Sequence, residues 1–386
     1  MIRVSHFVGL SGIGGVQRNF VEYINNQTPI GSKSDFLHKV YTFGEVDSQY
    51  RILTEVYDIK KINNLFSLIK EVCSKKDIVH FYNNLTSLKL AIFLFFIPVS
   101  NLILHERGTV WNFPYSRRML LRFIAWKAHL ILANSNATKI MLKNKFCISE
   151  KKIRVLHNGI NINTKCKSKA ITRNSSTFCI GFIGRLDTPK GVHVLIDAMQ
   201  KIAGNNIELR IAGHGILSDN LKNQAKYLKN ILFVGRVSEP YSFLSDLDLL
   251  VVPSIREPLG NVCLEAGICK VPVLATNVDG IPEIIENKFS GELIGATDKV
   301  VIDLPRGAVP LPEFVVNPVT KSLCTPKQVN STLLAEKILE LSSQPERLKY
   351  YAFNLHNKVV EYFNIYRYEK ELHIIYNEVN NFENLG

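Results

Sequence analysis

Residues 247–266 of this 386-residue chain read LDLLVVPSIREPLGNVCLEA, and this stretch decides the fold. Its first part, 247–253, is an apolar run without strict alternation, which is typical of a parallel strand buried on both faces. Glu257 follows in a loop, and Gly260 with Asn261 is expected to begin a helix. Open α/β sheets bind ligands at the carboxyl edge of their strands, and helix N-termini attract anions. The stretch therefore predicts a ligand site.

A second glutamate, Glu265, follows Glu257 by eight residues, about two helical turns, so both carboxylates can face one ligand. The alternative is structural, with Glu257 capping the helix and Glu265 pointing into solvent. A glutamate pair at this spacing does not by itself decide between the two interpretations.

Similar apolar runs alternate with helical stretches along the whole chain. The first series comprises residues 3–8, 38–43, 78–81, 102–105, 130–133 and 153–156. The second series comprises residues 179–184, 208–212, 231–234, 247–253 and 272–276. Alternating βα units predict doubly wound parallel sheets, so two series predict an α/β protein with two Rossmann-like domains.

The polar stretch 161–176 is the expected domain boundary, which gives domains of residues 1–167 and 168–361. The segment 295–328 contains five prolines and breaks the pattern. It is predicted to be a long insertion or loop.

A second motif lies at residues 181–191, which read GFIGRLDTPKG. A buried strand is expected to end at Gly184, and the following loop carries Arg185 and Lys190 before a helix at 192–199. Two cations at the carboxyl end of a strand can neutralise a diphosphate, the arginine as a fork and the lysine as a point charge. The alternative is an ordinary strand-to-helix turn with surface charges.

A third motif, GLSGIGGVQR at residues 9–18, directly follows the first strand. A glycine-rich loop here allows close approach of the backbone to a phosphate or a sugar. The alternative is a plain tight turn, because the spacing is not that of a dinucleotide fingerprint.

These three motifs, in this order, resemble family 4 of the retaining GT-B glycosyltransferases, and the resemblance covers nearly the whole chain. Supporting segments are 133–135 (ANS), 155–160 (VLHNGI), 213–215 (GHG), 233–237 (FVGRV) and 280–283 (GIPE). The resemblance implies a GT-B fold, in which two Rossmann-like domains face each other across a cleft. The chain departs from the family at Pro258-Leu259, where Gly-Phe or a similar pair is common, and in the length of segment 295–328.

The resemblance also implies catalytic roles. Arg185 and Lys190 would hold the diphosphate of a nucleotide-sugar donor, and Glu257 would contact the donor sugar. His105, at the end of a predicted strand, sits where the family often has a histidine near that sugar. For the other histidines in apolar segments, a structural role is the default.

Further donor contacts follow from the same resemblance. The backbone of Leu259, Gly260 and Asn261 would contact the sugar, Glu265 the ribose hydroxyls, and Val237 the base.

Gly14 and Gly15 would bring the first domain onto the phosphates, and a final helix at about 362–386 would cross back onto that domain. No cofactor is implied, because the nucleotide-sugar, carrying UDP or GDP, is a substrate.

No metal is expected. Asp246 and Asp248 spell D-x-D, but they directly precede the buried run 249–253 and are interpreted as a helix-to-strand junction. The resemblance implies retention of anomeric configuration, and no side chain is an obvious nucleophile. We therefore hypothesise front-side attack, with the departing phosphate taking the acceptor's proton.

The net charge of +13 is uneven. Residues 1–170 contain 25 Lys+Arg and 10 Asp+Glu, whereas the remainder contains 22 and 24. Within 89–169 the acids are only Glu106 and Glu150, and 116–129 predicts a basic amphipathic helix that can lie on an anionic membrane. A solvated surface or a domain helix with a core-facing side is the alternative.

A lipid-linked sugar diphosphate, or a lipopolysaccharide or capsule intermediate, is the preferred acceptor. Nucleic-acid binding is not expected, because no recognition motif accompanies the charge. A catalytically inactive scaffold is the other non-enzyme alternative.

Seven scattered cysteines without a C-x-x-C pair favour a reducing compartment. The N-terminal residues lack a signal-peptide layout, and the apolar run 90–99 is too short to span a bilayer, so a buried helix is preferred there. The expected location is cytoplasmic, peripheral on the inner face of the membrane.

Overall fold

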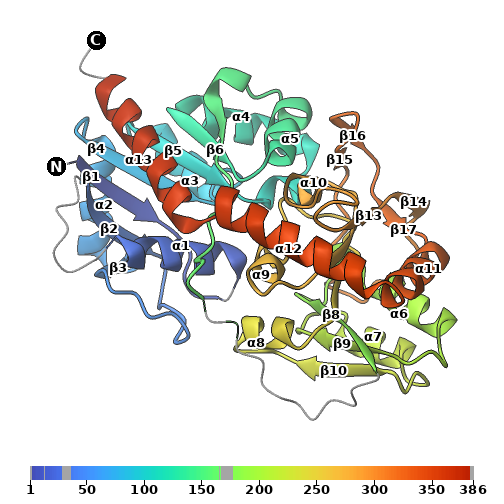
Figure 1. The fold of residues 1–386 in the computed structure, drawn as a ribbon. Coiled ribbons are helices and arrows are strands. Elements are labelled where there is room, and N and C mark those ends of the chain that lie inside the picture. The colour runs from blue at the N-terminus through green and yellow to red at the C-terminus, as the bar shows by residue number, and fades with distance from the viewer. Residues whose placement is uncertain (1, 13, 28–35, 165, 167–176, 383–386) are drawn as a thin grey trace. The chain divides into compact units, whose positions relative to one another are not determined.

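The computed structural model describes residues 2–12, 14–27, 36–164, 166 and 177–382 (Figure 1). The chain forms two compact units, and each is described by itself. Unit 1 comprises Met1–Asn161 and Phe363–Gly386, and unit 2 comprises Ile162–Tyr362.

Unit 1 is built on a parallel seven-stranded sheet with strand order β3-β2-β1-β4-β5-β6-β7. Its strands are β1 (Ile2–Phe7), β2 (Phe36–Thr42), β3 (Val56–Asp58), β4 (Asp77–Tyr82), β5 (Leu102–Glu106), β6 (Leu130–Ala133) and β7 (Ile153–Val155). Its helices are α1 (Gly15–Asn26), α2 (Ile62–Cys73), α3 (Leu88–Phe96), η1 (Thr109–Asn112), η2 (Tyr115–Arg117), α4 (Arg118–Lys127), α5 (Asn136–Phe146), η3 (Glu150–Lys152) and α13 (Ile365–Phe382).

Unit 2 is built on a parallel six-stranded sheet with strand order β10-β9-β8-β11-β12-β13. Its strands are β8 (Phe178–Ile183), β9 (Ile207–Ala212), β10 (Ile231–Gly235), β11 (Leu249–Val252), β12 (Val273–Thr276) and β13 (Glu292–Ile294). Its helices are η4 (Thr188–Lys190), α6 (Val192–Lys201), α7 (Ser218–Gln224), α8 (Pro240–Ser245), α9 (Asn261–Ile268), α10 (Ile281–Ile284), α11 (Ser331–Ser342) and α12 (Pro345–Tyr362).

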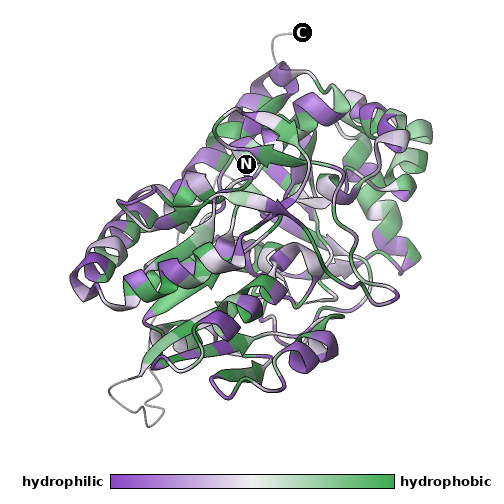
Figure 2. Ribbon diagram, turned by 90° about the vertical axis from the view of Figure 1, so that its right-hand side faces the viewer, coloured by the Kyte–Doolittle hydropathy of each residue, from purple (hydrophilic) through white to green (hydrophobic). Residues whose placement is uncertain are grey.

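Both sheets confirm the predicted doubly wound α/β class, because each has the strand order in which the chain reverses direction beside its first strand. All eleven predicted runs form strands. Consecutive strand residues point to opposite sides of a sheet, and the pairs Leu102–Ile103 in unit 1 and Leu249–Leu250 in unit 2 have no exposed surface, so both sides of each sheet are buried. Figure 2 shows most strands in the green of apolar residues and the helices banded in green and purple.

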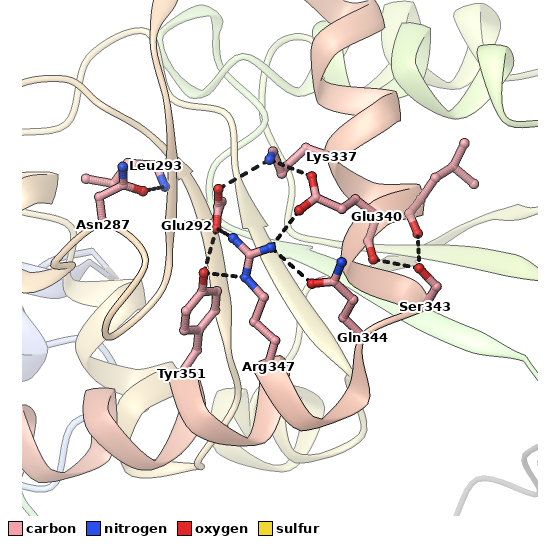
Figure 3. Close-up of polar contacts among 10 residues, drawn as sticks. Asn287, Glu292, Leu293, Lys337, Glu340, Ser343, Gln344, Arg347 and Tyr351 are labelled. Carbon is pink, nitrogen blue, oxygen red and sulfur yellow. Dashed lines mark hydrogen bonds and ion pairs between the residues drawn. The ribbon is translucent and has the colours of Figure 1, made fainter.

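Strand β13 was not predicted, because it carries a charged residue into the interior. Glu292 is buried, and its carboxylate accepts hydrogen bonds from Arg347 at 2.6 Å and from the Tyr351 hydroxyl at 2.7 Å (Figure 3). Lys337 lies 3.3 Å from its other oxygen. These contacts tie β13 to α11 and α12, and they neutralise the carboxylate where an apolar residue would be expected.

The proline-rich segment 295–328 is not simply a loop, which corrects that prediction. It contains two small antiparallel sheets, β14 (Ala296–Lys299) with β17 (Lys327–Val329) and β15 (Val315–Asn317) with β16 (Ser322–Cys324). Strands of three or four residues give too short a pattern to identify from sequence.

The prediction of a buried helix at 90–99 is only partly right. Helix α3 buries Leu90, Ala91 and Leu94, but Phe95 and Phe96 are 70% and 74% exposed. Among the described helices, none has both the length and the apolar character to cross a membrane.

Candidate functional site

The candidate site lies where the second sheet reverses its strand order. Strands β8 and β11 are neighbours there, with Ile180 opposite Leu249. The loop after β8 carries Arg185 and Lys190, and the loop after β11 carries Glu257. Because parallel strands present their carboxyl ends on one edge, the fold places both predicted motifs side by side.

Lys190 and Glu257 form an ion pair. The Lys190 Nζ donates to Glu257 Oε2 at 2.5 Å, and the side chains are 23% and 10% exposed. The Ser254 hydroxyl lies 3.4 Å from the same oxygen. In such a partly buried setting, a charge-assisted hydrogen bond fixes both groups in position. Two residues predicted to act on one donor are thus brought into direct contact.

Gly191 explains how the two loops fit together. Its φ of +66° is in the left-handed region, and an added Cβ would lie 2.0 Å from the Pro253 carbonyl oxygen. On the other side of the turn, the Pro189 carbonyl accepts the N–H of Ile255 at 2.8 Å and that of Arg256 at 3.2 Å. The lysine turn is therefore packed onto the glutamate loop through backbone contacts that leave no space for a side chain.

Arg185 occupies the same edge but is more open. Its side chain is 66% exposed and lies 3.3 Å from Asp187. The guanidinium is thus accessible, as a group that is to bind a phosphate must be.

Helix α9 begins as predicted. Gly260 is its N-cap, with φ +101°, and Asn261 is its first residue, so the helix presents backbone N–H groups at the edge that carries Glu257. Leu259 is buried, and Glu265 lies partly exposed one turn into the helix. Val237, partly exposed, follows β10 at the border of the sheet.

Asp248 confirms the interpretation of the D-x-D sequence as a helix-to-strand junction. It lies between α8 and β11, and its Oδ2 accepts the backbone N–H of Cys179 at 2.7 Å. Its carboxylate thus joins β8 to β11.

The predicted glycines of unit 1 lie at the start of α1. Gly14 is the N-cap, and its N–H donates to the Tyr50 hydroxyl at 3.2 Å, while Gly15 is the exposed first residue. The backbone at Gly14 is extended, so its conformation alone does not require glycine.

His105 has a different setting from the other predicted residues. It is 1% exposed, and its ring stacks on that of His80 at 5.4 Å between centroids and 9° between planes. Neither ring nitrogen has a hydrogen-bond partner within the described part of the chain. Burial, the charge of Arg107 and His80 hold the pKa of His105 well below its usual value, so the ring is neutral. The role that the resemblance implies for His105 stays a prediction.

Sequence reasoning gave no role to two groups beside the site. Asp279 is buried and accepts the backbone N–H of Glu257 at 2.9 Å. Arg256 is partly buried, and this burial lowers its pKa, whereas the carboxylates of Glu257 and Asp279 favour its charged form. Asp279 directly precedes the quoted segment GIPE and Arg256 lies within the quoted stretch 247–266, and that position was the available signal.

Two family models match this chain. Residues 48–164 match the model described as Glycosyltransferase Family 4, and residues 164–302 match Glycosyl transferases group 1. Together the two matches run from residue 48 to residue 302 and meet at 164. These two matches confirm the recognised resemblance to family 4 of the GT-B glycosyltransferases.

Similar proteins include the capsular polysaccharide biosynthesis glycosyltransferase CapM of Staphylococcus aureus. It is 32% identical over 208 residues, which are 49% of this chain and 54% of CapM. An N-acetylgalactosaminyltransferase of Campylobacter jejuni, whose name specifies a diphospho-undecaprenol-linked substrate, is 30% identical over 42% of this chain and 44% of its own. The chain thus matches about half the length of these curated relatives.

Among solved structures, Anabaena Alr3699/HepE in complex with UDP and glucose has a TM-score of 0.74 at 18% identity, with 98% of this chain and 100% of that chain covered. WaaG, a glycosyltransferase involved in lipopolysaccharide biosynthesis, has a TM-score of 0.63 at 16% identity, with 96% and 99% covered. Together with the two parallel sheets, these likenesses confirm the predicted GT-B fold.

Proposed function

We propose that this chain is a retaining, metal-independent glycosyltransferase that takes a sugar from a UDP- or GDP-sugar. The observation that carries the proposal is the Lys190–Glu257 pair at the point where the second sheet reverses its strand order. In this assignment, residues 168–361 bind the nucleotide-sugar. Residues 1–167, with the helix of 362–386, form the acceptor side.

The proposed chemistry is stabilisation of the departing nucleoside diphosphate. The exposed Arg185, the Lys190 ammonium and the start of α9 at Gly260 are positive groups at one sheet edge. An ammonium has three N–H donors, so Lys190 can bind a phosphate oxygen while it still holds Glu257. Preorganised donors of this kind stabilise charge that develops during the reaction, without a metal.

Glu257 then has its second carboxylate oxygen for the donor sugar, beside the backbone of Leu259 and Asn261. We assign Glu265 to the ribose hydroxyls and Val237 to the border of the base. Gly14 and Gly15 are assigned to the donor phosphates from the first domain. His105, buried at the end of β5, remains the histidine that we assign near the donor sugar.

For retention, we propose attack of the acceptor hydroxyl on the face from which the diphosphate leaves. The new glycosidic C–O bond forms as the sugar–phosphate bond breaks, and the departing phosphate takes the hydroxyl proton. The anomeric configuration of the product tests retention, and trapping of a covalent sugar–enzyme adduct would contradict front-side attack.

The acceptor that we propose is a lipid-linked or lipopolysaccharide glycan in surface-polysaccharide synthesis. The names of the capsular and undecaprenol-linked relatives support it. We propose further that the protein acts in the cytoplasm, peripheral on the inner face of the membrane, through residues in 89–169.

An aromatic–basic surface on α3 and α4 supports the membrane location. We define it as the exposed side chains Phe95, Phe96, Met119, Trp126, Lys89, Arg117 and Arg122. The two helices pack together, with the rings of Phe95 and Phe123 6.4 Å apart. Aromatic side chains surrounded by cations match the boundary between headgroups and acyl chains of an anionic leaflet.

A thermal-shift screen against UDP- and GDP-sugars in EDTA tests the donor site. We expect one donor to raise the melting temperature of the wild type, but not that of Lys190→Ala or Glu265→Ala. Equal shifts in wild type and variants would contradict the site, and a shift that requires a divalent cation would contradict metal independence.

A further inference from the structure

Asp279 joins two segments that lie far apart in sequence. It is 2% exposed in the loop between β12 and α10. Its Oδ2 accepts the N–H of Glu257 at 2.9 Å, and its Oδ1 accepts the N–H of Val316 at 2.7 Å. Its own N–H donates to the Val316 carbonyl at 3.1 Å. One buried carboxylate therefore binds the loop that carries Glu257 with one oxygen and the β15–β16 hairpin with the other.

The backbone at this position is unusual. Asp279 has a φ of +46°, a left-handed conformation that asparagine, aspartate and glycine adopt most readily. This conformation occurs directly before Gly280, whose N–H donates to the Glu257 carbonyl at 3.1 Å. An added Cβ on Gly280 would lie 2.1 Å from the Pro258 carbonyl oxygen. Both backbone groups of Glu257 are thus held by the 279–280 turn.

The charge of the carboxylate is also accommodated. A buried carboxylate is costly unless hydrogen bonds satisfy it, and two backbone N–H groups do so here. Arg256, partly buried directly before Glu257, is the neighbouring cation. The turn, the arginine and the hairpin therefore form one connected structure around the backbone of Glu257.

We propose that Asp279 is a positioning residue, through which the β15–β16 hairpin of the proline-rich segment holds Glu257 in reach of Lys190. The hairpin then supports the loop that carries Glu257 through the two hydrogen bonds of the Asp279 carboxylate. Its effect on catalysis rests on the function proposed above, whereas its effect on the backbone does not.

Two substitutions of Asp279 keep the left-handed backbone but remove one or both of the hydrogen bonds that its carboxylate accepts. Asp279→Asn keeps the shape and tolerates the left-handed backbone. Its amide oxygen can accept only one of the two N–H groups, and its NH2 group faces the other donor. Asp279→Gly also tolerates the backbone but removes both acceptors. Lys321→Gly, at the positive-φ turn of the same hairpin, is the control that leaves the Asp279 contacts intact.

Hydrogen exchange of the wild type and these variants tests, without any assay of activity, whether Asp279 holds the backbone of Glu257 and Val316. We expect peptides that contain Glu257 and Val316 to exchange faster together in Asp279→Gly, and Lys321→Gly to leave the Glu257 peptide unchanged. Unchanged protection of the Glu257 peptide in Asp279→Gly would contradict the claim that Asp279 holds this backbone, even if no donor is ever found.

Steady-state kinetics with the nucleotide-sugar tests the positioning role. We expect kcat to fall about 10- to 100-fold in Asp279→Gly, less in Asp279→Asn, with the donor KM changed less than threefold. The donor KM should change little because the phosphate contacts remain, whereas kcat should fall because Glu257 is misplaced. An unchanged kcat in a folded Asp279→Gly would overturn the role. If the wild type itself transfers no sugar, the proposed function fails. Hydrogen exchange still decides whether Asp279 holds the backbone of Glu257.

Discussion

The ammonium of Lys190 and the carboxylate of Glu257 meet at 2.5 Å, although 67 residues separate them in sequence. Each comes from the loop after one of two neighbouring parallel strands, and backbone contacts through Pro189 hold the loops together. The packing of these two loops therefore brings the two charged groups together.

Lys190→Ala should abolish most of the activity. Loss of one preorganised partner of the leaving group typically costs about 10²–10³-fold in turnover. The variant also leaves the Glu257 carboxylate without its cation, which should cost about 1–3 kcal/mol of stability. Turnover and the urea midpoint measure the two effects. Lys201→Ala, at the exposed end of α6, is the control, and near-wild-type turnover of Lys190→Ala would remove the assignment.

Gly191→Ala should destabilise the protein by about 2–6 kcal/mol, the sum of left-handed strain and overpacking. Its Cβ would meet the Pro253 carbonyl at 2.0 Å. Gly204→Ala is a matched control, because Gly204 also has a positive φ but has no atom within 4 Å of an added Cβ. Urea denaturation compares the two. Equal losses in both variants would show that the close packing of the two loops contributes nothing.

Acidification should destabilise unit 1. Burial lowers the pKa of His6, His80 and His105 well below the usual value, and that of His38 to about 4. Above pH 6.5 these rings are neutral in both the folded and the unfolded chain, so their contribution is constant. As the pH falls below 6.5, the unfolded chain takes up protons that the folded chain excludes.

The free energy of unfolding should therefore drop by about 1.4 kcal/mol per pH unit for each buried histidine, and the contribution of His38 should level off near pH 4. Urea midpoints between pH 7.5 and 5 measure the slope. His80→Phe should make it shallower, whereas His214→Asn, at an exposed position, should not. Parallel slopes for all three proteins would contradict this account.

The double variant Phe95→Ser/Phe96→Ser should bind vesicles of phosphatidylglycerol and phosphatidylethanolamine at least about 10-fold more weakly. The two rings would lose apolar burial worth more than about 1.4 kcal/mol together. Phe353→Ser, 61% exposed on α12, is the control for a general loss of surface hydrophobicity. Vesicle sedimentation measures binding. If the double variant and the control bind alike, the aromatic–basic surface is not the docking site.

Sequence predicts the sheets well because long apolar runs identify buried parallel strands without knowledge of their neighbours. It predicts less where a contact with a distant segment decides the structure. Strand β13 is hidden because Glu292 is neutralised by Arg347, 55 residues away. The hairpin at β15 becomes ordered through Asp279, 37 residues earlier.

The candidate site shows the same division. Parallel strands made it predictable that Lys190 and Glu257 share one edge, but not that they form an ion pair. His105 was placed correctly at the end of its strand, yet sequence does not reveal that His80 and Tyr368 cover its ring. Whether a side chain at the end of a strand is exposed depends on helices from elsewhere in the chain.

Unit 1 owes part of its core to α13, whose residues Tyr368, Leu372 and Tyr376 are buried in the same cluster as Val4 and Ile78 of the first sheet. Figure 1 shows α13 crossing that sheet. Tyr376 also binds the His80 ring at 2.7 Å. A ribosome makes residues 1–161 first and residues 363–382 some 200 residues later. During that interval residues 1–161 lack the helix that supplies this part of their core, while the whole of unit 2 is made without interruption. Unit 2 is thus free to fold before unit 1, and the nascent unit 1 is the part that a chaperone would need to protect.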